Sequence, residues 1–142
     1  MTVERILADK GSEVVTIEPR RSLAEAARLL AERRIGAIVA AEGGRVLGIL
    51  SERDIVRAVA GKGPSSLDEP VSAHMTAEVF TCTGEMSITE VMEVMTARKF
   101  RHMPVVEGGR LVGIVSIGDV VKNRLAELEA EEQALREYIA TA

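Results

Sequence analysis

The feature that most constrains this chain is an internal repeat. When the 142-residue sequence is shifted by 65 residues, it aligns with itself without a gap. The run Glu-Gly-Gly-Arg at 42–45 recurs at 107–110, and the pattern Gly-Ile-x-Ser-x-x-Asp at 48–54 recurs at 113–119. Such a match predicts two copies of one supersecondary unit. A unit of about 50 residues is marginally stable alone, so we expect the two copies to pack together.

Each copy is predicted to fold in the order β-α-β-β-α. Short β-branched runs are typical of strands, and the Gly-Gly pair of each copy suits the positive φ angles of a tight hairpin turn. Ser22 with Glu25, and Ser87 with Glu90, have the capping-box spacing, in which a hydroxyl and a carboxylate satisfy free amides where a helix begins. The predicted strands are 14–17, 35–41, 46–50, 79–82, 103–106 and 111–115, and the predicted helices begin near Ser22, Ser51, Ser87 and Ser116.

Composition marks the boundaries of the copies. Residues 1–60 are predicted to hold the first repeat with its lead-in, and 71–125 the second repeat. Glycine, proline and serine make 61–70 a linker. A helical tail is predicted at 126–142, and the helix that continues from the second repeat through this tail carries a broken apolar stripe. The stripe consists of Leu125, Leu128, Leu135 and Ile139. Two interpretations stay open: the helix docks on its own domain, or it contacts a partner helix.

Charge and aromatic content exclude a nucleic-acid binder. The net charge is -4, and five glutamates with two arginines in residues 123–142 supply -3 of it. The rest of the chain is therefore nearly neutral and lacks a basic footprint. Aromatic residues make up 2% of the chain, with no Trp, so base-stacking platforms are not expected either.

Cysteine and histidine content argues against a metal site. The single cysteine, Cys82, cannot form an internal disulfide, and its apolar surroundings favour a small buried side chain. Two histidines, His74 and His102, give poor support for a metal cluster.

No apolar run approaches the roughly 20 residues of a membrane span, and the start of the chain lacks a signal-peptide layout. We therefore expect a cytoplasmic protein that does not span a membrane.

Several segments resemble the CBS domain. Ile-Gly-Ala-Ile-Val at 35–39 leads to Gly-Ile-Leu-Ser-Glu-Arg-Asp at 48–54, and Arg-His-Met-Pro-Val-Val at 101–106 leads to Gly-Ile-Val-Ser-Ile-Gly-Asp at 113–119. Val-Ser-Ala-His-Met-Thr at 71–76 resembles the lead-in to a second copy. The chain is similar to stand-alone bacterial CBS-pair proteins. The resemblance implies an α/β (α+β) fold with two repeats packed sheet to sheet in pseudo-two-fold symmetry.

The resemblance also implies a function: a regulatory module that binds an adenine nucleotide between its repeats and signals occupancy to a protein partner. AMP is the first candidate ligand, with ADP, ATP, NAD(H) and S-adenosylmethionine as others. No enzyme activity and no catalytic cofactor are expected, because the sequence lacks a nucleophile–base pair and a phosphate-binding glycine loop. The alternative is a purely structural dimerisation module with degenerate ligand sites. The implied nucleotide contacts are Lys10, Thr16, Ala37, Ser51, Arg53, Asp54, Ala77, Val79, Arg101, His102, Met103, Pro104, Ser116 and Asp119.

The Ser-x-x-Asp motif has two interpretations. A carboxylate accepts two hydrogen bonds in a fork, which suits the adjacent hydroxyls of a ribose, and a helix N-terminus suits a phosphate. The same residues would equally serve as a helix cap, Ser51 with Asp54 and Ser116 with Asp119. Both roles can coexist.

The two copies differ most at one pair of positions, where Arg101-His102 replaces Gly36-Ala37. A cation pair at the start of a buried strand is costly unless something anionic faces it, and the resemblance implies nucleotide phosphate. A surface arginine beside a structural histidine is the alternative. Lys10 has the same ambiguity between phosphate contact and solvated surface. Pro104 removes an amide donor from its strand and predicts an irregular or edge segment.

We also expect a homodimer. CBS pairs commonly associate into flat discs, and two-fold pairing is the commonest soluble assembly. The apolar helical runs from Leu23 to Leu30 and from Val91 to Met95 are the surfaces that the sequence offers for sharing.

Overall fold

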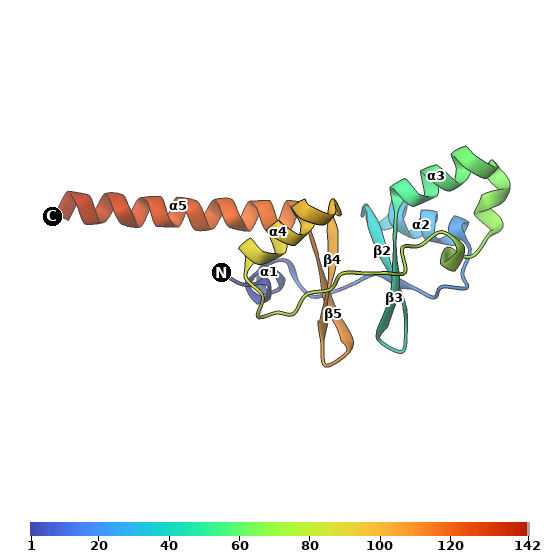
Figure 1. The fold of residues 1–142 in the computed structure, drawn as a ribbon, viewed down its shortest axis with the longest axis horizontal. Helices are drawn as coiled ribbons and strands as arrows, with labels where there is room; N and C mark the ends of the chain where they lie inside the picture. Colours follow the sequence, from blue (N-terminus) through green and yellow to red (C-terminus); the bar gives the residue numbers. More distant parts are fainter. Residues whose placement is uncertain (142) are drawn as a thin grey trace.

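The computed structural model describes residues 1–141 and contains two αβ units whose sheets lie next to each other at the centre of the molecule (Figure 1). The sheet of the first unit has the order β1-β2-β3, with β1 parallel and β3 antiparallel to β2. The predicted order β-α-β-β-α is confirmed for this copy. Its elements are β1 (Thr16–Ile17), α2 (Leu23–Arg33), β2 (Ala37–Glu42), β3 (Arg45–Ser51) and α3 (Glu52–Lys62).

The second unit has a smaller sheet, in which β4 and β5 form an antiparallel pair. Its elements are α4 (Ile88–Arg98), β4 (His102–Glu107), β5 (Arg110–Ser116) and α5 (Ile117–Thr141).

The strand predicted at 79–82 is wrong except at Cys82, which forms one isolated parallel bridge to Val105. In the first unit the amide of Val39 donates to the carbonyl of Val15 at 3.4 Å. Pro104 occupies the position of Val39 and has no amide, so the second sheet lacks this bond.

The local signals in the sequence are realised in both units. The hydroxyl of Ser22 accepts the amide of Glu25 at 3.2 Å, and that of Ser87 accepts the amide of Glu90 at 3.1 Å, so both serines cap their helices as predicted. Within residues 1–141, neither glutamate carboxylate accepts the amide of its serine, so the second half of the predicted capping box is not formed. The hairpin glycines have the positive φ angles that their turns require, which are 58° and 81° at Gly43 and Gly44 and 57° and 79° at Gly108 and Gly109.

The two lead-ins are exchanged between the units. Helix α1 (Val3–Lys10) belongs to the same core as α4, β4 and β5, and the turn η2 (Val71–Ala73) packs into the core of the first unit. Ile6 and Val71 lie one repeat length apart and are 1% and 0% exposed. The first ten residues, which the sequence groups with the first repeat at 1–60, thus contribute apolar side chains to the core of the other unit.

Glycines in β3 and β5 make this exchange possible. A Cβ at Gly48 would lie 2.5 Å from the sulfur of Met75, and a Cβ at Gly113 would lie 2.7 Å from a methyl carbon of Leu7. Each lead-in thus rests directly on the backbone of the opposite unit. The exchange ties the units together in pseudo-two-fold fashion.

The segment predicted as a linker, 61–70, contains the 3-10 helix η1 (Pro64–Asp68) with the fully buried Ser66. One further expectation needs correction. The apolar residues offered for sharing between subunits lie in the cores instead. The side chains concerned are Leu23, Leu30, Val91 and Met95, each at most 5% exposed.

Helix α5 is the one element that leaves the body of the molecule. It packs against α4 at its start and then projects outward as the red helix of Figure 1, with its C-terminal end far from both sheets. Every residue from 128 to 141 is exposed. Within residues 1–141, no helix combines the length and apolarity needed to cross a membrane.

Candidate functional site

Both Ser-x-x-Asp motifs form helix caps. At α3, the hydroxyl of Ser51 accepts the amide of Asp54 at 3.3 Å, and a carboxylate oxygen of Asp54 accepts the amide of Ser51 at 2.8 Å. At α5, the corresponding distances between Ser116 and Asp119 are 3.1 and 2.9 Å. The capping interpretation is therefore correct for both motifs, and the caps hold both carboxylates at the ends of β3 and β5.

A cavity of about 300 Å³ opens beside the first motif and is lined from both repeats. Asp54 from the first repeat lines it together with Arg101 and His102 from the second. A cavity of this size is at the lower end of the range for small-molecule sites. Within residues 1–141, the carboxylate of Asp54 uses only its Oδ2 for hydrogen bonds, which come from the amide and hydroxyl of Ser51.

Positive charge predominates around this cavity. Arg53, Arg57 and Lys99 line it in addition to Arg101, whereas Glu52 and Asp54 are its acidic residues. Such an excess of cations creates a positive potential that suits an anionic ligand. Sequence reasoning missed Arg57 and Lys99. Arg57 could have been found, since it follows Arg53 by about one helical turn.

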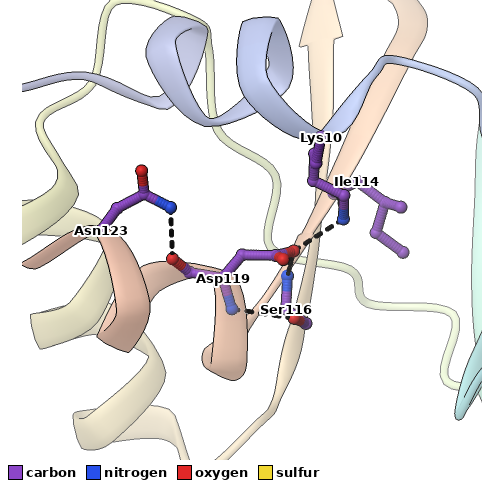
Figure 2. Close-up of polar contacts among 5 residues, drawn as sticks. All are labelled: Lys10, Ile114, Ser116, Asp119 and Asn123. Atoms are coloured by element: carbon purple, nitrogen blue, oxygen red, sulfur yellow. Dashed lines mark hydrogen bonds and ion pairs between the residues drawn. The ribbon is translucent and has the colours of Figure 1, made fainter. Parts of the chain in front are cut away.

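The carboxylate of Asp119 has a different neighbour. The ammonium of Lys10 lies 2.6 Å from its Oδ2 and also donates to the carbonyl of Ile114 at 3.1 Å (Figure 2). Burial alone would raise the pKa of Asp119, but the bonds from Lys10 and from the amide of Ser116 outweigh it and lower the pKa. Asp119 is thus a partly buried carboxylate already paired with a cation from α1.

His102 lies between the two motifs. A Cβ at Gly36 would be 3.6 Å from its Cε1, so the imidazole faces the start of β2. Burial lowers the pKa of His102, the charges of Lys10 and Arg101 lower it further, and Asp119 and Glu52 oppose them. The imidazole is therefore neutral at pH 7 in the ligand-free protein.

The remaining implied contacts are distributed differently. Ala37 and Ser51 line the cavity with Asp54, as does Thr76, which the sequence did not single out. Met103 and Pro104 are buried in β4. Thr16 lines a separate cavity near the hairpin glycines Gly43 and Gly44. Neither Ala77 nor Val79 is among the residues that line the 300 Å³ cavity, although both follow Thr76 closely.

Comparison with known proteins agrees with this architecture. A crystal structure of a CBS-domain-containing protein from Agrobacterium tumefaciens shares 50% identity, covers 87% of this chain and 99% of its own, and superimposes with a TM-score of 0.84. A CBS domain protein from Pyrobaculum aerophilum, solved with AMP, shares 29% identity over 84% of this chain and 89% of its own, with a TM-score of 0.76.

The CBS domain pair of protein MJ0100 was solved with 5′-methylthioadenosine and S-adenosyl-L-methionine. It shares 25% identity, covers 89% of this chain and 98% of its own, and has a TM-score of 0.79. The family model for the CBS domain matches twice, at residues 5–61 and 71–126. These two matches together cover most of the sequence, with one match for each repeat. The chain therefore belongs to the CBS domain family, as a pair of CBS domains.

Proposed function

We propose that this protein is a non-catalytic regulatory module that binds an adenosine-containing ligand, AMP first, in the cavity beside Asp54. One observation carries the proposal: a capping-box carboxylate from one repeat meets Arg101 and His102 from the other around a single cavity. The ligands of two solved CBS-domain structures, AMP in one and S-adenosyl-L-methionine with 5′-methylthioadenosine in the other, support the ligand class. ADP, ATP and NAD(H) share the adenosine group and belong to the same proposal.

Each repeat contributes one recognition role, Asp54 from the first and Arg101 from the second. The free oxygen of Asp54 accepts the ribose hydroxyls, because its other oxygen is held by Ser51. Arg101 meets the phosphate, for which a guanidinium offers a planar fork of donors. The neighbouring cations Arg53, Arg57 and Lys99 add positive potential around the same cavity.

The second motif accepts a ligand less readily in this proposal. Lys10 occupies the carboxylate of Asp119, so a ribose would have to displace an ammonium at 2.6 Å. We therefore expect the first equivalent of AMP to bind beside Asp54. A second equivalent binds only where its phosphate draws Lys10 away from Asp119.

Regulation follows from the placement of the ligand between repeats. A nucleotide that contacts α3 of one repeat and β4 of the other stabilises one relative arrangement of the two, and a protein partner that recognises this arrangement senses occupancy. We propose that the module does this as a homodimer.

A thermal-shift experiment with a nucleotide panel tests the proposed function. At 100-fold excess over Kd, one-site linkage stabilises the folded protein by about 2.7 kcal/mol. AMP is expected to raise the melting temperature, and GTP to raise it less. If no adenine compound raises it, the ligand proposal is wrong, and a purely structural dimerisation module becomes the better explanation.

A further inference from the structure

Helix α5 carries an apolar seam with heptad spacing that runs from residue 121 to residue 139. Its positions alternate by four and three residues along the helix and span about 27 Å at 1.5 Å per residue. The seam consists of Val121, Leu125, Leu128, Glu132, Leu135 and Ile139, in which every apolar member is between 41% and 65% exposed. Apolar residues repeating every 3.5 positions are the pattern of a supercoiled helix pair. Within the described residues 1–141, nothing covers this face beyond residue 127.

We propose that this seam pairs with the same seam of a second copy, in a parallel, in-register, two-stranded coiled coil. Charges beside the seam carry the choice of partner and orientation, since these flanking positions select both in coiled coils. In a parallel pair, Arg124 of one helix faces Glu129 of its partner, and Glu131 faces Arg136. Two-fold symmetry repeats both contacts, so all four flanking pairs are of opposite charge.

The antiparallel arrangement has the opposite electrostatics. Overlapping all six seam positions in antiparallel order brings Glu129 against Glu129 of the partner and Glu131 against Glu131 of the partner. It also brings Lys122 against Arg136. These are like-charge contacts, which disfavour the pairing. The charges beside the seam therefore favour the parallel helix pair and disfavour the antiparallel one.

Glu132 is the one charged residue of the seam. Its carboxylate pairs with Arg136 of its own helix at 2.6 Å, which offsets part of the charge. A single polar residue inside a seam fixes register and number of strands at a cost in stability. The coil is therefore expected to be in register and to be weaker than a fully apolar one, with the repeats of the two copies brought close together at its base.

Disulfide cross-linking tests the orientation directly. In the parallel register, position 132 of one copy faces position 132 of the other, so Glu132→Cys should form an interchain disulfide under mild oxidation. Glu137→Cys lies on the outer face and is the matched control, with the same change of residue and little cross-linking expected. The native Cys82 does not interfere, because it is 2% exposed and burial raises its pKa to about 11.

Charge reversal gives a second readout. Glu131→Arg, made in the Glu132→Cys chain, should lower the cross-linked fraction several-fold, and adding Arg136→Glu should restore it. Equal cross-linking of the Glu132→Cys and Glu137→Cys chains would overturn the proposal, as would a Glu132→Cys chain that stays unlinked. A strengthened dimer on Arg136→Glu alone would indicate the antiparallel arrangement and overturn it too.

This inference does not rest on the ligand site. Titration of AMP into the reduced Glu132→Cys chain should give the parent affinity, because position 132 lies in the exposed part of α5 and no residue of α5 lines the cavity. The two proposals therefore fail separately: loss of cross-linking leaves AMP binding as it was, and a chain without AMP binding still cross-links.

Discussion

Asp54 and Asp119 occupy equivalent positions in the two repeats, yet they have different contacts. Both close a helix cap with the serine three positions before them. Asp54 opens onto a cavity lined by cations from both repeats, whereas Asp119 is already bonded to Lys10 at 2.6 Å. A repeated motif thus supplies the same local geometry twice, while residues from distant segments decide which copy keeps a carboxylate oxygen without a cation beside it.

Substitution of Asp54 should have the largest effect on AMP binding. Asp54→Ala should weaken AMP binding by roughly 10- to 150-fold, since hydrogen bonds to a charged group contribute about 1.5–3 kcal/mol. Asp119→Ala should change the first binding event by less than threefold. Both variants lose the carboxylate half of a capping box and should lose about 1 kcal/mol of stability. Isothermal titration beside a melting curve measures the two effects separately.

Equal AMP affinity in the two variants and the parent, with both melting lower, would leave only the capping role. In that case the cavity beside Asp54 would not be the nucleotide site. A larger loss for Asp119→Ala would place the first ligand in the other repeat and would require Lys10 to move.

Arg101 comes next in expected size. Arg101→Ala should weaken AMP about 10-fold, which corresponds to the lower end of the range for charged hydrogen bonds because this side chain is exposed. Adenosine lacks the phosphate and serves as the internal control, with an unchanged affinity expected. A parallel loss for adenosine and AMP in titration would show that Arg101 does not recognise phosphate.

Lys10→Gln removes the cation that pairs with Asp119 and so makes this carboxylate more like that of Asp54. The ion pair is partly exposed, so the melting temperature should fall by no more than about 4 °C. Because the pKa of Asp119 is lowered in the folded protein, the pair stabilises above the ordinary Asp pKa and is lost as pH falls through the lowered value. The variant should therefore show less acid destabilisation than the parent.

Stoichiometry shows whether Lys10 controls access to the second motif. We expect the Lys10→Gln chain to bind a second equivalent of adenosine, which the parent does not. A stoichiometry that stays at one in titration would mean that the second motif is a helix cap without a ligand role.

The sequence predicted what depends on neighbouring residues and missed what depends on distant ones. The hairpin glycines and the Ser22 and Ser87 caps follow from spacings of a few residues, and all were confirmed. The exchange of lead-ins could not be predicted, because no local pattern shows that Ile6 packs in the other repeat's core. The pairing of Lys10 with Asp119 joins residues 109 positions apart.

The failed strand at 79–82 is instructive in a different way. Its own residues are as strand-like as those at 14–17. The partner strand lacks a hydrogen-bond donor, because Pro104 has no amide. From the sequence, Pro104 is predicted to make its own strand irregular. In the structure, its missing amide instead affects the neighbouring segment at 79–82. A strand prediction therefore needs the donors of the neighbouring strand as well as the pattern of the strand itself.

The smallest expected effect is a fraction of a proton taken up at His102. Burial and the charges of Lys10 and Arg101 lower the pKa of this imidazole, so it is neutral in the ligand-free protein at pH 7. A phosphate bound beside Arg101 would favour the imidazolium and raise the pKa again. AMP binding should therefore take up protons near pH 6.5, and AMP affinity should rise as pH falls from 7.5 to 6.5.

The stability of the ligand-free protein should change in the opposite sense. An unfolded chain protonates His102 near pH 6.5, whereas the folded one resists until a lower pH. Stability associated with His102 is thus present above pH 6.5 and is lost between that value and the lowered pKa. AMP should reduce this loss, because it favours protonation in the folded state.

Titration at pH 6.5 in two buffers of different ionisation enthalpy measures the proton uptake. The phosphate of AMP titrates near pH 6 itself, so His102→Asn is the control that isolates the contribution of the imidazole, and adenosine is the control without phosphate. We expect uptake with AMP in the parent and less in the His102→Asn chain, with none for adenosine in either. The same uptake with AMP in both chains would show that His102 does not face the phosphate, and the cationic side of the cavity would then consist of Arg101 and its neighbouring Arg and Lys side chains alone.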